Sequence, residues 1–307
     1  MTTAPHAARR TDTTPDPGVR DCGYGDEFRH VYDRIFRKDA YADLTGRVLA
    51  GWHPDPAAGT LELGVGTGRV AVPLARELIR VATADRPGGT GDPETPAGAG
   101  DLPEIVGVDS SLTMLEGLRT EIDRHRLPIT PVHGDIRVER EDDRRYGLVY
   151  CVCATLSMLT HPDEQRAVIR AAARALAPGG VLVVETAHPG HVRALHDGRR
   201  DASFFTPYPE PNTGLLTCST LLPGDQPLWR ASHVWFEGDG TSRVGTEISR
   251  LTEPEEVDAY AAQAGLVPID RQADWLGNPL APDSPMYIAR YAHAGHDTEA
   301  GERDGDA

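Results

Sequence analysis

The chain has 307 residues, of which 39% are hydrophobic, a size that fits one large α/β domain with an insertion or two small domains. Asp and Glu number 47 against 31 Lys and Arg, so the formal net charge is −16. This balance argues against a nucleic-acid partner, because phosphate neutralisation needs clustered Lys and Arg. The four cysteines lack zinc-ligand spacing, and no signal peptide or membrane-length apolar run is present. We therefore expect a cytoplasmic protein with reduced thiols.

The N-terminal part of the chain predicts a disordered segment followed by two helices. Residues 1–20 are rich in Thr, Pro, Ala and Arg and show no hydrophobic periodicity, so we expect them to be disordered. From Tyr24 to Phe36 the apolar residues recur at helical spacing, which predicts an amphipathic helix. A second helix is expected from Tyr41 to Trp52, where two nearby prolines end it.

The segment TLELGVGTGRVAVPL, from Thr60 to Leu74, predicts a short strand, a glycine-rich turn and a helix beginning near Arg69. Such a turn lets a ligand approach the backbone N–H groups at a helix N-terminus. A dinucleotide fingerprint needs a small third residue, but Arg69 occupies that position. Glu62 suits a cationic or hydroxyl-bearing ligand better than a pyrophosphate. A tight turn without a ligand and a nicotinamide-type oxidoreductase are the alternatives at this point.

ELGVGTG resembles motif I of the class I S-adenosylmethionine-dependent methyltransferases, E/D-x-G-x-G-x-G. The resemblance implies that Glu62 lies near the methionine end of the cofactor and that the glycines let the chain pass close to it. It also implies that Tyr24 and Tyr32 in the first helix cover the cofactor and substrate pocket. The glycines concerned are Gly64, Gly66 and Gly68.

Residues 86–103 are rich in Gly and Pro, which predicts a flexible insert. The next strand is expected from Glu104 to Asp109, and an acid at that strand end suits hydrogen bonds to the ribose hydroxyls. The alternative for Asp109 is a helix N-cap, a role that Ser110 or Ser111 could take instead.

Two further motifs resemble those of the family. VDSSLTML places Met114 where the family commonly flanks the adenine, and Ser110 in the same cofactor-binding turn. A third strand from Ile129 to Ile136 ends in Gly-Asp-Ile. The resemblance implies that Asp135 accepts a hydrogen bond from the adenine amino group and that the backbone of Ile136 contacts the ring.

The apolar run from Tyr146 to Leu159 predicts a strand buried on both faces of a parallel sheet, with Cys153 at the mouth of the cofactor site. The family often has Asn or Asp just beyond Cys153, whereas this chain has Ala154 and Thr155. A helix from Pro162 to Leu176, a Pro-Gly-Gly turn and a buried strand ending at Glu185 are expected next.

The C-terminal third predicts three antiparallel strands, because alternating segments are separated by Gly-Asp turns. This part resembles the lid of bacterial sugar-amine and glycine-type methyltransferases. A helix from Glu253 to Ala264 and a closing segment from Trp275 to Tyr291 follow.

The predicted fold is a doubly wound, seven-stranded, mostly parallel sheet with a small antiparallel β lid insertion. Residues 21–189 and 250–292 are expected to form the Rossmann-like methyltransferase domain, residues 190–249 the lid, and residues 293–307 a disordered acidic tail. These boundaries follow from the resemblance together with the composition of the segments.

The resemblance implies transfer of a methyl group from S-adenosyl-L-methionine to an N or O atom of a small-molecule acceptor. The acceptor would be natural-product or sugar-like, in bacterial secondary metabolism such as antibiotic biosynthesis. The alternative is a protein of the same fold that binds the cofactor but catalyses a non-methylating reaction, such as a cyclisation, or has a regulatory role. No nucleic acid, membrane or metal is expected, and a homodimer is left open.

The candidate bases are histidines near the expected acceptor site, and His188 is favoured because it follows the end of the fifth strand. His191 and His233 are the others, while Tyr208 and Trp235 are candidate walls of the substrate pocket. The candidate cofactor-binding residues are Tyr24, Tyr32, Glu62, Gly64, Gly66, Gly68, Asp109, Ser110, Met114, Asp135, Ile136 and Cys153.

Overall fold

A computed structural model describes residues 23–36, 38–84, 103–138 and 145–295 of the chain. The expected disordered N-terminus, nearly all of the 86–103 insert, and the tail beyond residue 295 lie outside the described residues. Within those ranges no helix is both long enough and apolar enough to cross a membrane.

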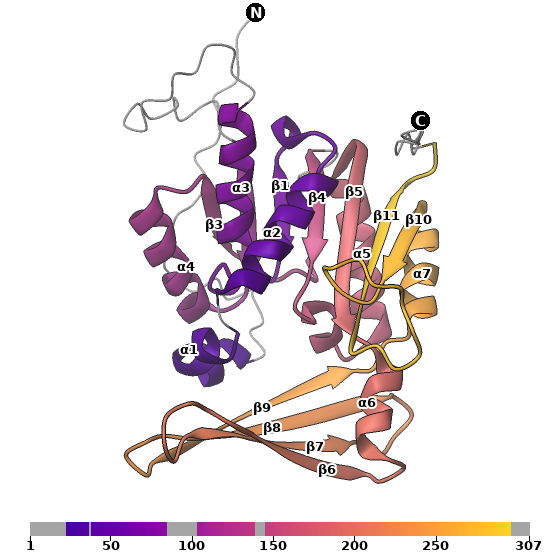
Figure 1. Ribbon diagram of the computed structural model, residues 1–307. Coiled ribbons are helices and arrows are strands. Elements are labelled where there is room, and N and C mark those ends of the chain that lie inside the picture. The colour runs from indigo at the N-terminus through magenta and orange to yellow at the C-terminus, as the bar shows by residue number, and fades with distance from the viewer. Residues whose placement is uncertain (1–22, 37, 85–102, 139–144, 296–307) are drawn as a thin grey trace, which may run out of the picture.

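The main sheet has seven strands in the order β10-β11-β5-β4-β1-β2-β3 (Figure 1). The pairs from β3 to β5 are parallel, whereas β11 is antiparallel to both β5 and β10. The predicted seven-stranded, mostly parallel sheet is therefore confirmed. Its strands are β1 (Thr60–Leu63), β2 (Ile105–Asp109), β3 (Ile129–His133), β4 (Tyr146–Cys151), β5 (Leu176–Ala187), β10 (Leu266–Gln272) and β11 (Met286–His293).

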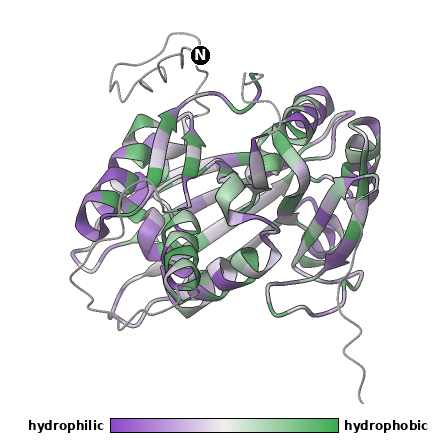
Figure 2. Cartoon of the chain, turned by 90° about the horizontal axis from the view of Figure 1, so that it is seen from above, coloured by the Kyte–Doolittle hydropathy of each residue, from purple (hydrophilic) through white to green (hydrophobic). Residues whose placement is uncertain are grey.

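Hydrophobic cores lie on both faces of this sheet, because successive side chains of a strand point to opposite sides. Leu182 of β5 belongs to a core cluster that includes residues of α5 and α7, and Val183 belongs to a second cluster that includes residues of α2, α3 and α4. The helices show hydrophobic and hydrophilic residues on different sides (Figure 2). These helices are α1 (Tyr24–Ile35), α2 (Ala40–Trp52), α3 (Ala71–Ala84), α4 (Leu112–His125), α5 (Pro162–Ala175), α6 (Pro189–His196) and α7 (Pro254–Gln263), with short 3-10 turns η1 (Pro56–Ala58) and η2 (Thr155–Met158).

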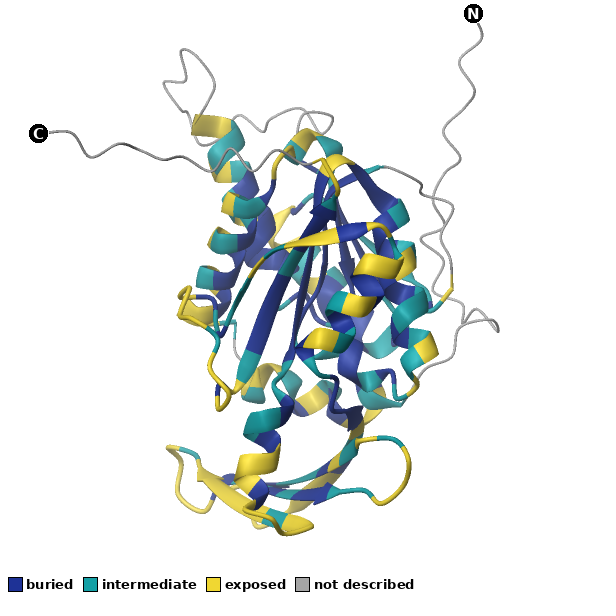
Figure 3. Ribbon diagram, turned by 90° about the vertical axis from the view of Figure 1, so that its right-hand side faces the viewer, coloured by how far each residue is buried: buried dark blue, intermediate teal, exposed yellow. Residues whose placement is uncertain are grey.

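A second, four-stranded antiparallel sheet, here called the lid sheet, has the order β6-β7-β8-β9. It lies across the end of the main sheet toward which β4 and β5 point (Figure 1). The main-sheet strands are largely buried, whereas the lid sheet carries many exposed residues (Figure 3). The strands are β6 (Asp201–Pro207), β7 (Gly214–Leu221), β8 (Leu228–Phe236) and β9 (Ser242–Arg250).

Two lid elements differ from the sequence prediction. The prediction had three strands, but β6 adds a fourth, and α6 connects β5 to it. Most of β6 is exposed, so its residues show no alternation of apolar and polar types. The second sheet spans Asp201 to Arg250, and the predicted lid boundaries at 190 and 249 stay a prediction.

The opposite end of the main sheet holds a buried histidine. His53 lies 2.9 Å from the hydroxyl of Thr60 through Nε2, and burial lowers its pKa to about 4. Between pH 6.5 and 4 the unfolded chain therefore binds more protons than the folded one. The stability associated with neutral His53 is lost as the pH falls through that window.

We expect acidification from pH 7 to pH 5 to lower the free energy of unfolding of the wild type by up to about 2 kcal/mol more than that of His53→Gln. One pKa unit corresponds to about 1.4 kcal/mol. Urea unfolding of both proteins at the two pH values measures this difference. Equal losses in the two proteins would show that His53 does not titrate as its burial predicts.

Candidate functional site

The glycine turn joins β1 to α3, and its three glycines have positive φ angles of 83°, 53° and 79° for Gly64, Gly66 and Gly68. A Cβ on Gly64 would lie 2.4 Å from Thr155 Cγ2, and a Cβ on Gly68 would lie 2.6 Å from Leu118 Cδ1. At Gly66 the nearest described atom would be the Tyr32 hydroxyl, 3.9 Å away. Two glycines therefore serve packing, and the middle one keeps space open at the turn.

We expect alanine at these positions to separate stability from ligand binding. Gly68→Ala should lower the free energy of unfolding by about 2 kcal/mol, because it combines a left-handed backbone with a side-chain clash. Gly66→Ala should cost only about 1 kcal/mol but weaken ligand binding more than tenfold, because its methyl group enters the open space. Thermal unfolding and calorimetry measure the two effects. Equal binding by wild type and Gly66→Ala would contradict a ligand at this turn.

Glu62 is the buried acid of this turn, with 2% of its surface exposed. Its carboxylate accepts a hydrogen bond of 2.7 Å from the hydroxyl of Tyr150. Burial raises the pKa of Glu62 to about 8, because desolvation disfavours the charged form. A cation arriving beside Glu62 would favour ionisation of the carboxyl group.

Asp109 ends β2 beside the turn. Its Oδ2 accepts the Gly66 N–H at 2.8 Å and its Oδ1 accepts the Ser111 N–H at 2.9 Å. Ser111, not Asp109, is the N-cap of α4, and its hydroxyl accepts the Met114 N–H. The carboxylate of Asp109 therefore belongs to the edge of the glycine turn.

Asp135 follows β3, next to Asp109. His133 is the register partner of Asp109, and the Gly134 N–H donates to the Asp109 carbonyl at 3.0 Å. Both carboxylate oxygens of Asp135 accept hydrogen bonds from Arg137, at 2.7 and 2.8 Å. Because the guanidinium already holds this carboxylate, the predicted contact of Asp135 with an adenine amino group stays a prediction.

The other residues predicted to lie near the adenine are Ile136, Ser110 and Met114, and each has different neighbours. Ile136 packs against the main core, and the carbonyl of Ser110 lies 3.0 Å from His133 Nε2. Met114 is 2% exposed and packs with Phe28 in a small cluster between α1, α4 and the lid sheet.

Helix α1 covers the glycine turn. The hydroxyl of Thr67, inside the turn, donates to Asp33 at 2.7 Å. Tyr32 sits against the turn, where burial and then the neighbouring Cys153 raise its pKa well above the usual value. The ring of Tyr24 meets Tyr32 edge-on at 6.3 Å and stacks on Phe28 at 4.2 Å. Helix α1 thus places Tyr32 beside the glycine turn and Tyr24 next to Tyr32, and the role of the two tyrosines in covering a cofactor and substrate pocket stays a prediction.

A buried polar network lies at the carboxyl ends of β4 and β5. The Cys153 N–H donates to Glu185 at 2.8 Å, and the Trp275 indole N–H donates to the other oxygen of that carboxylate at 2.7 Å. Arg69 Nη1 lies 3.2 Å from Cys153 Sγ. Burial raises the pKa of Cys153 to about 12 and also raises that of Glu185. The sequence prediction included Cys153 but missed the roles of Arg69, Glu185 and Trp275 in this network.

The candidate bases lie on two elements. His188 is the N-cap residue of α6, and its Nδ1 is buried without a hydrogen-bond partner among the described residues. His191 contacts the carbonyl of Asp283 at 3.2 Å. His233 is on β8, where its ring meets Phe28 edge-on at 5.7 Å and stacks with Trp235 at 6.0 Å.

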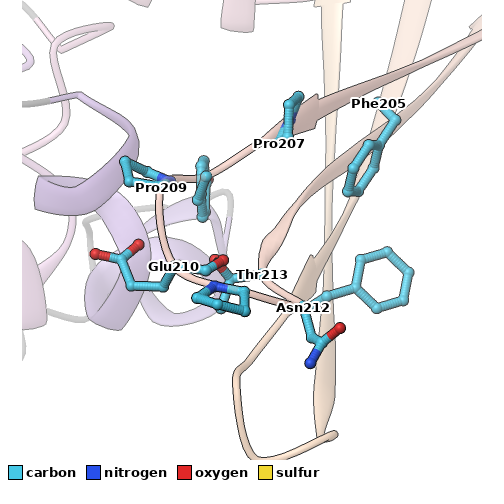
Figure 4. Close-up of a pocket in the computed structure, with 9 residues that line it drawn as sticks. Phe205, Pro207, Pro209, Glu210, Asn212 and Thr213 are labelled. Carbon is cyan, nitrogen blue, oxygen red and sulfur yellow. The ribbon is translucent and has the colours of Figure 1, made fainter.

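The two candidate pocket walls both contact residues of α1. Trp235 is 1% exposed and packs edge-on against Phe28 at 5.3 Å, so it belongs to the contact between α1 and the lid sheet. Tyr208 lies in the β6–β7 hairpin, with the Arg34 guanidinium 6.0 Å from its ring centroid. A hollow of about 580 Å³ opens at this hairpin (Figure 4). Tyr208 is among the residues that line this hollow, and its role as a wall of the substrate pocket stays a prediction.

No group of three or more His, Cys, Asp or Glu suited to a metal ion occurs within the described ranges. The chemistry that the geometry supports is recognition of a ligand by the glycine turn, with Glu62 and Asp109 as acidic groups. Glu62 suits a cationic group and Asp109 suits hydroxyls.

Comparisons with known proteins find methyltransferases. Residues 88–180 match the family model described as "Methyltransferase domain". Over 118 residues the chain is 33% identical to dTDP-4-amino-2,3,4,6-tetradeoxy-D-glucose N,N-dimethyltransferase of Saccharopolyspora spinosa, a match covering 38% of this chain and 43% of that protein. The match thus spans less than half the length of that relative.

Two solved structures are similar over most of the chain. The CcbJ methyltransferase of Streptomyces caelestis superposes with a TM-score of 0.73 at 27% identity, covering 92% of this chain and 99% of that one. CalS10, an amino pentose methyltransferase of Micromonospora echinaspora, gives a TM-score of 0.59 at 20% identity, covering 85% and 96%. This second likeness concerns the fold alone. The predicted resemblance to class I methyltransferases and the predicted fold are confirmed.

Proposed function

We propose that this chain, which has the class I methyltransferase fold, is an S-adenosyl-L-methionine-dependent methyltransferase. One observation carries the proposal: the buried Glu62 and the Asp109 carboxylate converge on one glycine turn, with Asp109 bonded to the Gly66 N–H at 2.8 Å. A ligand that combines ribose hydroxyls with a cationic end matches these two acids. The match to the methyltransferase domain model supports the same ligand.

The residues present fit this cofactor. Gly66 keeps open space at the turn, Asp109 would hold the ribose, and Glu62 would face the methionine end. When bound, the cofactor supplies a methyl group activated by a sulfonium, so the protein mainly has to position an acceptor and exclude water. Helix α1 and the lid sheet, which close over the strand ends, would do both (Figure 1).

For the acceptor, we propose an N or O atom of a small, sugar-like natural product. The named relative, 33% identical over 118 residues, is described as an N,N-dimethyltransferase of an amino sugar, which supports this class. His188 and His233 remain the proposed bases, and Trp235 and Tyr208 the proposed pocket walls. The proposal includes a cytoplasmic location without nucleic-acid or membrane partners, and a mass measurement in solution would distinguish a monomer from a homodimer.

Calorimetric titration with S-adenosylmethionine, S-adenosylhomocysteine and NAD tests the cofactor. We expect heat from the first two and none from NAD. Tritiated-methyl transfer to a panel of amino sugars and their hydroxyl analogues then tests the reaction. Binding without transfer to any acceptor would favour a non-methylating protein, and heat from NAD alone would refute the proposal.

A further inference from the structure

A row of three polar side chains crosses the lid sheet on the face that meets α1. Thr217 of β7 and His233 of β8 are register partners, and Thr217 Oγ1 lies 3.1 Å from His233 Nδ1. On the other side, His233 Nε2 lies 3.5 Å from Glu247 Oε1 of β9. The side chains of His233 and Glu247 are 16% and 22% exposed, so the row is half-buried but accessible.

Three aromatic side chains of α1, Phe28, Tyr24 and Tyr32, connect this row to the glycine turn. The His233 ring contacts Phe28, which stacks on Tyr24. Tyr24 in turn meets Tyr32, whose hydroxyl is the nearest described atom to a Cβ added at Gly66. The row therefore lies on the face of the lid sheet that contacts α1, and the lid sheet lies across the strand ends beside which an acceptor would have to sit (Figure 1).

The spacing within the row favours a cation. At 3.5 Å the contact between His233 and Glu247 is at the outer limit of a hydrogen bond. Among the described residues, Glu247 has no other hydrogen-bond partner. If Nδ1 carries the ring proton and donates it to Thr217, the lone pair of Nε2 faces the carboxylate. An N–H donor that contacts both groups relieves this repulsion.

We propose that Thr217, His233 and Glu247 form an ammonium-binding and proton-accepting subsite, and that the acceptor of the proposed methyl transfer is an amine. Glu247 binds the ammonium form by charge. Nε2 of His233 takes one proton from the ammonium nitrogen, which keeps the electron pair needed for attack, and the imidazolium that forms is stabilised by Glu247. Thr217 is a positioning residue that orients the ring. The proton then passes to solvent.

Other charged groups near the row contribute to its field. On α1, the carboxylate of Glu27 accepts the Thr246 N–H of β9 at 2.7 Å. Arg243 of β9 is opposite Trp235 and exposed. Glu27 adds negative charge to the row from the side of α1. Arg243 lies near the start of β9, opposite Trp235.

The test compares D-glucosamine with D-glucose, two probes that differ by an ammonium and a hydroxyl at one ring position. Binding is followed by tryptophan fluorescence at pH 7, because Trp235 adjoins His233, with and without S-adenosylhomocysteine. We expect glucosamine to bind at least about tenfold more tightly than glucose. Glu247→Gln should abolish this preference by weakening glucosamine alone. Ser232→Ala, which removes the hydrogen bond to Thr246 on the opposite face of the same strands, should preserve it.

A preference that persists in Glu247→Gln, or a wild type that binds both sugars equally, would overturn the subsite. A second measurement is independent of sugar affinity. His233→Gln should lower the rate of methyl transfer to an amine by about 100-fold while leaving S-adenosylhomocysteine binding intact. Unchanged turnover would overturn the proton-accepting role. This inference rests on the proposed function, and absence of S-adenosylhomocysteine binding in the wild type would identify failure of that function instead.

Discussion

Replacing Asp109 with asparagine is expected to weaken S-adenosylhomocysteine binding by at least about 100-fold. The carboxylate accepts the Gly66 N–H and the Ser111 N–H, and it stands where the ribose hydroxyls are proposed to donate. A hydrogen bond to a charged group contributes about 1.5–3 kcal/mol, so replacing two of them by one neutral hydrogen bond and one donor–donor contact corresponds to at least about 100-fold. An asparagine side chain offers only one acceptor oxygen and places an N–H₂ group where a second acceptor is needed.

Calorimetry with S-adenosylhomocysteine measures this loss, and circular dichroism monitors the fold of the variant. Asp123→Asn is the matched control, because Asp123 is an exposed acid on α4, the helix that follows Asp109. We expect Asp123→Asn to bind as the wild type does. If Asp109→Asn, correctly folded, kept its affinity within a factor of about three, the ribose role of Asp109 would have to be abandoned.

The sequence predicts those parts of the site whose residues lie close together in one short segment of the chain. The glycines of the turn and the strand that precedes them follow from one stretch, since left-handed backbone at Gly64 and Gly68 excludes larger residues. The placement of Asp109 follows from a strand end and a serine that can cap the next helix. Local backbone rules therefore suffice for this half of the site.

The buried network at the carboxyl ends of β4 and β5 has no such local signature. Arg69, Cys153, Glu185 and Trp275 come from four separate segments, and only the folded sheet brings them together. Likewise, nothing in the motif around Asp135 indicates that Arg137 holds its carboxylate. Pairings of this kind depend on side-chain geometry, which periodicity and composition do not encode.

The lid sheet shows a third limit. Trp235, the candidate pocket wall, packs against Phe28 at 5.3 Å and is 1% exposed, a contact that no local pattern in the sequence indicates, and its role toward a substrate stays a prediction. Conversely, Glu247 was not singled out, because a lone acid in an alternating strand is typical of a solvent-facing position. Cross-strand register, which pairs Thr217 with His233 and places Glu247 diagonally, reveals the row.

The affinity of the site for S-adenosylmethionine is expected to rise with pH up to about pH 8. Burial raises the pKa of Glu62 to about 8, so at neutral pH the carboxyl group of the ligand-free protein is mostly protonated. A bound cation lowers that pKa, and binding below pH 8 therefore releases a proton. Affinity then falls by up to about tenfold for each pH unit below 8, until the pKa of the bound state is reached.

Three ligands and one variant separate this effect from other titrations. S-adenosylmethionine and S-adenosylhomocysteine both carry the ammonium of the methionine end and should both show the pH dependence, whereas 5′-methylthioadenosine lacks it and should not. Glu62→Gln should remove the dependence and bind both cationic ligands less tightly at pH 8.5. The same variant should be more stable than the wild type at pH 8. A carboxyl group with a raised pKa loses its contribution to the stability of the fold as the pH rises from its pKa in the unfolded chain through 8.

Calorimetry in two buffers of different ionisation enthalpy counts the released proton directly. A count of zero at pH 7 would mean that Glu62 is already ionised in the free protein or does not meet the cation.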